Sequence, residues 1–328
     1  MPDLSVEIAG VRLSNPLVLA SGIWGTTPEL LERAARAGAG AVTAKTCTPR
    51  PRRGHRNPTA LDWGHGLLNA MGLPNPGAEE EAGMLAEARR RISPLGVPLI
   101  ASIAADTVEG FAEAAAAVSR ARPDLIEVNI SCPNVASDHG EMFAASPEAA
   151  AEATRAAKSA TSIPCLVKLS PLVADIAAIA RAVAEAGADG ITAINTLPGM
   201  LVDAETGLPI LANRTGGISG PALKPVALRC VYEVCAAVGI PVVGTGGVGT
   251  GVDAVEMISA GAAAVGVGTA VAAGGVEVFA RILDELGCWM VARGFESLPA
   301  IRGRVHRAAP DGRETYPPPV PAWRPHEG

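Results

Sequence analysis

Residues 164–196, PCLVKLSPLVADIAAIARAVAEAGADGITAINT, carry the repeating unit from which the fold can be worked out. The apolar runs at 164–170 and 190–196 have the length and composition of strands buried in a parallel sheet. Between them, residues 174–187 are alanine-rich and amphipathic, which is typical of a helix. This stretch therefore predicts a strand, a helix and a second strand parallel to the first.

The same unit recurs along the whole chain. Further runs with the character of buried parallel strands lie at 16–21, 40–46, 98–104, 125–132, 241–247 and 263–269. Helical patterns lie at 28–38, 79–92, 109–121, 147–161, 223–238, 252–260 and 276–293. Eight strands joined by right-handed helical crossovers favour closure into a (β/α)8 TIM barrel over an open, doubly wound sheet. The alternating segment at 6–16 is expected to form a hairpin that caps the closed end of the barrel.

Domain organisation follows from where this pattern ends. We expect one barrel domain at 1–307 and a tail rich in proline and charge at 308–328. Two connections, at 47–78 and 197–222, exceed the roughly 12 to 15 residues beyond which structureless loops are uncommon unless they are functional. They are expected to form the walls and lid of a site.

Composition excludes several classes of protein. Hydrophobic residues make up 48% of the chain and charged residues 18%, which excludes a disordered chain. The net charge of −6 comes without a basic face that could neutralise nucleic-acid phosphates. No window of about 20 apolar residues predicts a membrane span, so a cytoplasmic protein is expected. The six cysteines lack C-x-x-C spacing, which predicts reduced thiols and no metal or iron–sulfur cluster in this chain.

Polar residues at the carboxyl ends of the predicted strands mark the candidate site, because TIM barrels place their reacting groups there. The residues at or just beyond these ends are Ser21, Lys45, Thr46, Asn129, Cys132, Asn134, Lys168, Asn195 and Thr196. Only four lysines occur in the chain, and two of them, Lys45 and Lys168, are in this set. A lone ammonium group in an apolar run needs an anionic partner, which could be a bound ligand or a structural carboxylate.

Glycine-rich turns end the seventh and eighth predicted strands, at 244–247 and 266–269. Glycines let backbone N–H groups converge on an anion, and TIM barrels bind phosphate after these two strands. We therefore expect a ligand that carries phosphate. The alternative is that these glycines only form tight turns.

Thiol and amide side chains at the mouth of the predicted barrel indicate a reaction. The Cys132 thiol could act as a general base, because the ordinary cysteine pKa of about 8.5 lies near the working pH, although buried cysteines are more often inert. The amides of Asn69, Asn129, Asn134 and Asn195 can both donate and accept hydrogen bonds, which suits a planar cyclic imide. The alternative for these asparagines is turn formation.

Taken in order, these motifs resemble dihydroorotate dehydrogenase, the flavin enzyme of pyrimidine synthesis, over residues 4–295. The resemblance rests on ASG at 20–22, KT at 45–46, NAMGLPN at 69–75, NISCPN at 129–134, VKLS at 167–170, INT at 194–196, TGGISG at 215–220 and both glycine turns. So many motifs in one order are a specific signal.

The resemblance implies FMN-dependent oxidation of (S)-dihydroorotate to orotate in de novo pyrimidine biosynthesis. Cys132 would take the C5 proton, and the C6 hydride would pass to flavin N5. FMN would contact Ser21, Lys45, Thr46, Ser102, Asn129, Lys168, Ile194, Gly220, Gly246, Gly247, Gly268 and Thr269. Dihydroorotate would contact Lys45, Asn69, Ala70, Met71, Gly72, Leu73, Asn129, Asn134, Asn195 and Thr196.

The resemblance also implies a subclass. Cysteine at position 132 is similar to the soluble class 1, whereas the membrane-bound class has serine there and an N-terminal anchor. Residues 195–247 resemble the class 1B form, whose partner subunit bears FAD and a [2Fe-2S] cluster and passes electrons to NAD. A homodimer or a heterotetramer with that subunit is expected, and a fumarate-linked homodimer is the alternative. The chain departs from the family at Ala60 and Leu61, which replace Pro-Arg, and at Ser102, where the partner-dependent form often has asparagine.

Other functions stay open at this stage. A flavin oxidoreductase acting on a different pyrimidine would share nearly every motif. A phosphate-binding barrel isomerase or synthase without flavin would keep the glycine turns, but it would need a pair of acidic residues at strand ends. A noncatalytic barrel in an assembly would tolerate the loss of Cys132, Lys45 or Asn195, all of which are present.

Overall fold

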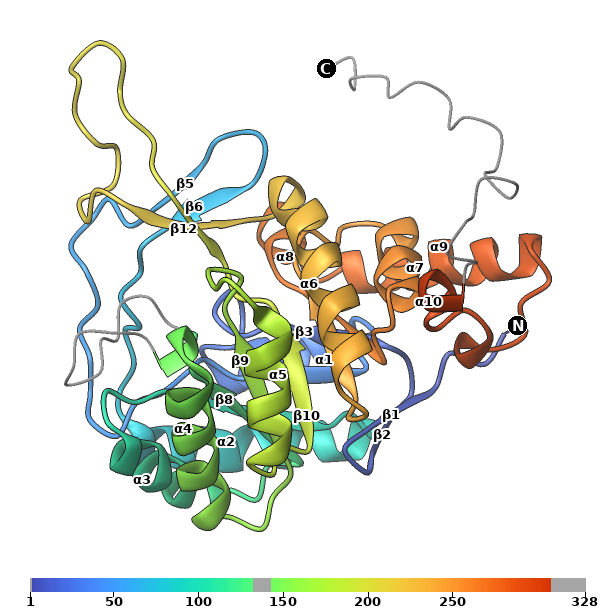
Figure 1. The fold of residues 1–328 in the computed structure, drawn as a ribbon, viewed down its shortest axis with the longest axis horizontal. Coiled ribbons are helices and arrows are strands. Elements are labelled where there is room, and N and C mark those ends of the chain that lie inside the picture. The colour runs from blue at the N-terminus through green and yellow to red at the C-terminus, as the bar shows by residue number, and fades with distance from the viewer. Residues whose placement is uncertain (1, 132–142, 308–328) are drawn as a thin grey trace.

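Eight parallel strands close into a barrel in the order β10–β13–β14–β3–β4–β7–β8–β9 (Figure 1). The computed structural model describes residues 2–131 and 143–307. The barrel strands are β3 (Leu17–Leu19), β4 (Ala41–Thr43), β7 (Leu99–Ile103), β8 (Leu125–Asn129), β9 (Cys165–Leu169), β10 (Gly190–Ala193), β13 (Val242–Thr245) and β14 (Ala264–Val267). Each lies within one of the eight predicted runs, so the predicted (β/α)8 barrel is confirmed.

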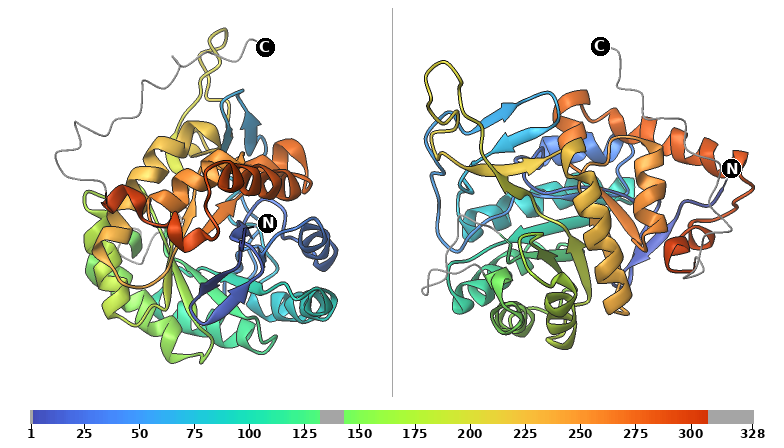
Figure 2. Two further views of the ribbon diagram at one scale, coloured as in Figure 1. Left: turned by 90° about the vertical axis from the view of Figure 1, so that its right-hand side faces the viewer. Right: turned by 45° about the horizontal axis from the view of Figure 1, so that its top comes forward.

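Helices surround the barrel and connect its strands (Figure 2). They are α1 (Pro28–Arg36), α2 (Ala78–Ile92), α3 (Val108–Ser119), α4 (Pro147–Ser159), α5 (Ile176–Glu185), α6 (Lys224–Ala237), α7 (Gly251–Ser259), α8 (Thr269–Gly274), α9 (Val278–Ala292) and α10 (Arg304–Arg307). Thr27, Thr107, Ser146, Asp175 and Thr250 accept a hydrogen bond from the first turn of their helices, which fixes where α1, α3, α4, α5 and α7 begin. The short helices α8 and α10 were not predicted.

The N-terminal hairpin closes one end of the barrel. Strands β1 (Val6–Ile8) and β2 (Val11–Leu13) pair antiparallel, as predicted. Ile8 and Leu13 pack against the first inward-facing layer of the barrel, which includes Val18, Ile100 and Leu125. The apolar layer at this end excludes water from the barrel interior.

Above this apolar layer the barrel interior is polar. Thr43, Glu127, Lys168, Thr192 and Thr245 face one small internal cavity of about 10 Å³. Buried polar groups are tolerated only when they are hydrogen-bonded or paired, so a polar layer here costs stability that an apolar layer would not. The main apolar core lies instead between the barrel and its helices.

A four-stranded antiparallel sheet covers the open end of the barrel, which we call the mouth. Its strands are β5 (Ala60–Asp62), β6 (Leu67–Asn69), β11 (Leu197–Gly199) and β12 (Gly216–Ser219), in the order β11–β12–β6–β5. In Figure 1 the labelled strands of this sheet lie on the opposite side of the molecule from β1 and β2. Segments 47–78 and 197–222 therefore form a wall over the mouth, as expected, but they do so by pairing with each other as strands, which was not predicted.

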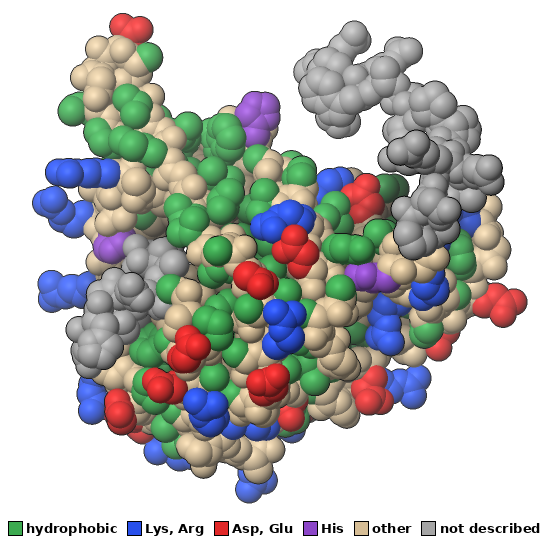
Figure 3. Space-filling model, viewed as in Figure 1, with side chains coloured by type: hydrophobic (Ala, Val, Ile, Leu, Met, Phe, Trp, Pro, Cys, Tyr) green, Lys and Arg blue, Asp and Glu red, His purple; other side chains and the backbone are tan. Residues whose placement is uncertain are grey.

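Residues 200–215, which we call the arm, join β11 to β12 and project beyond the barrel (Figures 1 and 2). Met200, Val202 and Leu208 on the arm are exposed, and Figure 3 shows hydrophobic side chains on this projection and on the surface beside it. Among the residues described, no helix is both long and apolar enough to cross a membrane.

Candidate active site

A cavity of about 550 Å³ lies between the carboxyl ends of the barrel strands and the sheet at the mouth. This volume is within the roughly 300–1,000 Å³ of ordinary small-molecule sites. The residues predicted from the sequence that line it are Ser21, Lys45, Thr46, Asn69, Met71, Gly72, Leu73, Asn129, Lys168, Ile194, Asn195, Thr196, Gly220, Gly246, Gly247, Gly268 and Thr269. Ala70 and Ser102 are buried outside this lining. Cys132 and Asn134 lie outside the described residues.

A buried carboxylate organises the floor of the cavity. Glu127 is 4% exposed and Lys168 is 5% exposed, and the Glu127 Oε1 atom lies 3.6 Å from the Lys168 Nζ atom. Oε1 also accepts hydrogen bonds from the hydroxyls of Ser21, at 2.9 Å, and Ser102, at 3.1 Å. Of the two partners that the sequence left open for Lys168, the structure places a protein carboxylate beside it.

Glu127 was missed in the sequence analysis. It is the one charged residue in the apolar run 125–129, two positions before Asn129, so alternation puts both side chains on the inner face of the barrel. Strand register then brings it level with Ser102 on the neighbouring strand. The charge within the run was the signal that could have found it.

Two asparagines are tied together on the wall of the cavity. The Asn195 Nδ2 atom donates to the Ser131 hydroxyl at 2.9 Å, and that hydroxyl donates to the Asn129 Oδ1 atom at 2.8 Å. The Asn195 Oδ1 atom accepts from the backbone N–H of Thr196 at 2.8 Å. These contacts fix both amides, and the Nδ2 group of Asn129 is left as a donor for a ligand, since the described residues supply no acceptor for it.

The two glycine turns form the other wall. Gly246, Gly247 and Gly268 line the cavity, and within 2–131 and 143–307 none of their backbone N–H groups donates to a protein acceptor. Helix α8 begins directly after Gly268, so the positive end of its backbone dipoles lies beside these donors. Unpaired N–H groups at a helix start are suited to bind an anion.

Lys224 stands behind this wall but its charge is already compensated. Its Nζ atom lies 2.6 Å from Asp253 Oδ1 and 2.9 Å from Glu256 Oε2. Anion binding at these turns therefore depends on backbone N–H groups rather than on this ammonium group.

A second buried carboxylate, Glu81 of α2, lies near Lys45. Glu81 is 3% exposed. Burial raises the pKa of its carboxyl from 4.5 to about 7, although the positive charge of Lys45 opposes that rise. Glu81 was not predicted either, because in the run of glutamates at 79–81 nothing marks the one that faces inward.

The raised pKa of Glu81 predicts a pH-dependent stability. Because the folded protein binds this proton more tightly than the unfolded chain between pH 4.5 and about 7, the free energy of unfolding should fall as the pH rises through that window. The full difference is on the order of 3 kcal/mol. Glu81→Gln should therefore be more stable than the wild type at pH 8 and show a smaller gain at pH 5, as measured by urea denaturation.

The exposed neighbour Glu80 supplies the control for this experiment. Because the negative charge of Glu80 is the smallest of the three contributions to the pKa of Glu81, Glu80→Gln should leave most of the pH dependence of unfolding in place. Equal pH dependence in Glu81→Gln and the wild type would show that Glu81 does not titrate in this window.

The described cysteines are not candidates for the general base. Burial raises the pKa of the Cys165 and Cys235 thiols to about 12, and it also raises the pKa values of Cys47 and Cys230. Cys288 is exposed on α9 and does not line the cavity. The prediction for Cys132 therefore has no competitor among these thiols.

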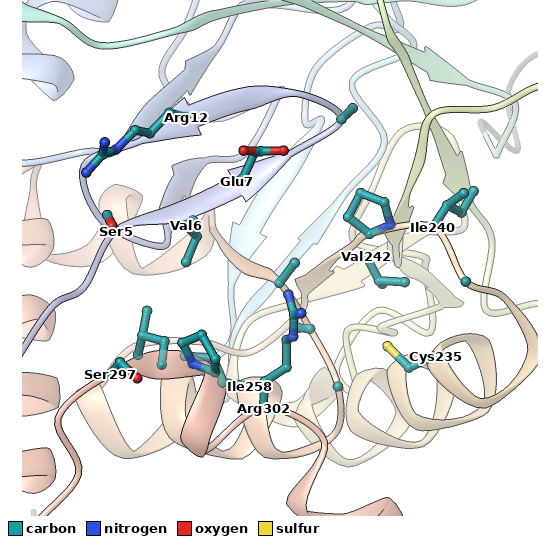
Figure 4. Close-up of a pocket in the computed structure, with 18 of the residues that line it drawn as sticks. Ser5, Val6, Glu7, Arg12, Cys235, Ile240, Val242, Ile258, Ser297 and Arg302 are labelled. Carbon is teal, nitrogen blue, oxygen red and sulfur yellow. The ribbon is translucent and has the colours of Figure 1, made fainter.

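A larger hollow, of about 880 Å³, lies at the other end of the barrel (Figure 4). It is bounded by the β1–β2 hairpin and by the amino-terminal ends of β13 and β14. Its charged lining residues, Asp3, Glu7, Arg12 and Arg302, are all exposed. In TIM barrels this end serves stability, so its size does not make it the reaction site.

Comparison with known proteins identifies the family of this chain. The sequence model of the family described as dihydroorotate dehydrogenase matches residues 3–290. This chain belongs to that family. The prediction that it is an oxidoreductase of the dihydroorotate dehydrogenase family is therefore confirmed.

Similar proteins in the dihydroorotate dehydrogenase family come from archaea and bacteria. The chain is 45% identical over 307 residues to a protein of Methanothermobacter thermautotrophicus, covering 92% of this chain and 98% of that one. It is 44% identical over 304 residues to a protein of Methanosarcina mazei, covering 92% and 95%, and 47% identical over 272 residues to one of Geobacillus kaustophilus, covering 82% and 85%. All three are named dihydroorotate dehydrogenase B (NAD(+)), catalytic subunit.

Proposed function

We propose that this chain is a catalytic subunit that oxidises (S)-dihydroorotate to orotate in de novo pyrimidine biosynthesis, with FMN bound at the mouth of the barrel. One observation carries the proposal. A single cavity joins an anion-binding wall of unpaired glycine N–H groups to a floor and wall that bear Lys45, Lys168, Asn129 and Asn195. Family membership supports the same chemistry.

The donors in the cavity fit FMN. The N–H groups of Gly246, Gly247, Gly268 and Thr269 suit its phosphate. The remaining residues predicted to contact FMN that also line the cavity, which would hold its ring and ribityl chain, are Ser21, Lys45, Thr46, Asn129, Lys168, Ile194 and Gly220. When bound, FMN supplies the hydride acceptor. The protein supplies orientation, charge and the exclusion of water.

The substrate would lie between this floor and the sheet above it. Asn69 of β6, Asn195 and Thr196 line the cavity near one another, because β6 pairs with β12, whose Gly217 contacts Thr196. Amide donors and acceptors match the ring edge of a cyclic ureide, and Lys45 offers a positive charge for the carboxylate of dihydroorotate. Met71, Gly72 and Leu73 complete the wall and limit the access of water.

Cys132 is proposed as the general base that removes the C5 proton. A thiolate at neutral pH accepts a proton readily, since the ordinary pKa of a thiol is near 8.5. Asn129 and Ser131, which are hydrogen-bonded to each other and through Ser131 to Asn195, come just before this position in the sequence. Asn134 is proposed as a further substrate contact.

We further propose that electrons leave through a partner subunit bearing FAD and a [2Fe-2S] cluster, with NAD as the final acceptor. The names of the three relatives support this choice over a fumarate-linked homodimer. A homodimer of this chain, or a heterotetramer with the partner, in the cytoplasm is the proposed assembly. The tail at 308–328 is proposed to lie outside the barrel domain.

The test is the absorbance spectrum of the purified chain under anaerobic conditions. We expect a flavin band that bleaches when dihydroorotate is added and that does not bleach with dihydrouracil or dihydrothymine. Bleaching by one of the latter alone would indicate a flavin oxidoreductase for another pyrimidine. A colourless protein that takes up no FMN would contradict the proposal and favour a phosphate-binding isomerase.

A further inference from the structure

Glu127 has no role in the contacts described so far for FMN or substrate. Yet Ser21, Ser102 and Lys168, on the floor of the cavity and beneath it, all contact its carboxylate. It is buried inside the barrel, and its Oε1 atom has three partners within 3.6 Å. A buried carboxylate loses its hydration, so it persists only when it is paired and hydrogen-bonded, as Glu127 is by Ser21, Ser102 and Lys168.

We infer that Glu127 is a positioning residue of the flavin site, which fixes the Lys168 ammonium group and the direction of the hydroxyl hydrogen bonds at the cavity floor. The inference rests on the proposed function and goes beyond it, because Glu127 touches neither ligand in that proposal.

Counting protons gives the direction of each hydrogen bond around the carboxylate. The Glu127 carboxylate can only accept hydrogen bonds, and the Ser21 hydroxyl donates its single proton to it. Ser21 is therefore left with lone pairs, which accept from the Lys168 Nζ atom at 3.1 Å. The ammonium group is thus held by both Glu127 and a serine that Glu127 has oriented.

The same reasoning gives the direction of the hydrogen bond between Thr46 and Ser102. Ser102 donates its only hydroxyl proton to Glu127, so in the 2.9 Å contact between the Ser102 and Thr46 hydroxyls the donor must be Thr46. Thr46 lines the cavity, and its proton is now committed to Ser102. Toward a ligand, its hydroxyl oxygen can only accept.

The floor consequently presents a fixed pattern to whatever binds above it. Lys168 donates with a positive charge, and Thr46 accepts. The matching ligand edge carries a hydrogen-bond acceptor close to an N–H donor, which is the pattern of an imide such as the pyrimidine portion of a flavin. Replacing the carboxylate with an amide would allow each hydroxyl to reverse, because an amide can donate as well as accept.

Glu127→Gln tests this role in the FMN-loaded protein. Loss of a negative charge near the flavin should favour its reduction, so the midpoint potential of bound FMN should become more positive. Release of Lys168 and the hydroxyls should raise the FMN dissociation constant by about tenfold or more. Glu285→Gln is the matched control, because Glu285 accepts from the Gly251 N–H at 2.6 Å outside the cavity and should leave both quantities unchanged.

A second variant keeps the test decisive if Glu127→Gln does not hold FMN. Ser102→Ala retains the carboxylate but removes one of its donors, so the negative charge is less compensated and the potential should shift in the opposite, more negative direction. A purely structural role predicts no shift of potential in either variant that retains FMN. If the midpoint potential shifted in the same direction in both variants, or in neither, the inference would be overturned.

A double-mutant cycle tests whether Glu127 acts through Lys168. In a Lys168→Met background, Glu127→Gln should change FMN affinity much less than it does in the wild type. Additive effects would overturn the inference. If the wild-type protein binds no FMN or is not reduced by dihydroorotate, the proposed function fails; if the wild type behaves as proposed and Glu127→Gln behaves like it, only this inference fails.

Discussion

Cys132→Ser should leave FMN bound and slow its reduction by dihydroorotate at pH 7 by about a hundredfold or more. A serine hydroxyl loses its proton far less readily than a thiol, so at neutral pH it is a poor base without further activation. The residues proposed to hold FMN are untouched by the change, so the flavin band should keep its full intensity. Stopped-flow measurement of flavin bleaching under anaerobic conditions gives the rate directly.

The pH dependence adds a second readout for the same variant. The wild-type rate should rise with pH and level off as the thiol becomes ionised, whereas the serine variant should keep rising across the same range. Cys288→Ser is the control, since this exposed thiol on α9 lies outside the cavity. In this variant dihydroorotate should reduce FMN at the wild-type rate. A wild-type rate in Cys132→Ser would remove the thiol from its proposed role.

The barrel could be predicted because each of its elements carries a local signal. Buried runs such as 165–169 alternate with helices whose first turns are capped by Thr27, Thr107 or Ser146, and a strand-helix repeat has few closed arrangements. The strand-end positions that line the cavity, such as Lys45 and Asn195, followed from the rule that barrel chemistry lies at carboxyl strand ends, whereas Met71, Gly72, Leu73 and Gly220 followed only from the resemblance to the family. Neither step needed a contact between distant residues.

The sheet over the mouth could not be predicted in this way. Strands β6 and β12 have three and four residues, and β12 begins with two glycines, so neither shows a strand pattern of its own. They exist because Asn69 and Gly217, 148 positions apart, are brought together once the barrel closes. Tertiary pairing rather than local propensity forms this sheet.

The anionic partner of Lys168 could not be predicted for a related reason. Lys168 could be seen to need an anion, but choosing between a ligand and a carboxylate required knowing that β8 and β9 are neighbours with Asn129 level with Lys168. That register places Glu127, two positions earlier on the same face, next to the ammonium group. The sequence alone showed that Lys168 needs an anionic partner but did not show which group this partner is.

Gly247→Ala should reduce FMN affinity by about a hundredfold or more, enough for the protein to be purified largely free of flavin. Gly247 has a φ of +75°, which side chains other than glycine rarely adopt. A Cβ atom there would lie 2.6 Å from the Cβ atom and 2.9 Å from the backbone N atom of Lys224. Lys224 cannot yield easily, because it starts α6 and its side chain is paired with Asp253 and Glu256.

The turn must therefore shift, and the backbone N–H groups proposed to bind the phosphate shift with it. Gly239→Ala is the control, because Gly239 lies outside the cavity and a Cβ atom there meets nothing within 4 Å. FMN affinity, measured by fluorescence quenching on titration of the flavin-free protein, should stay near the wild-type value in this control. Wild-type affinity in Gly247→Ala, with an unchanged circular dichroism spectrum, would place the phosphate elsewhere and separate the glycine turn from cofactor binding.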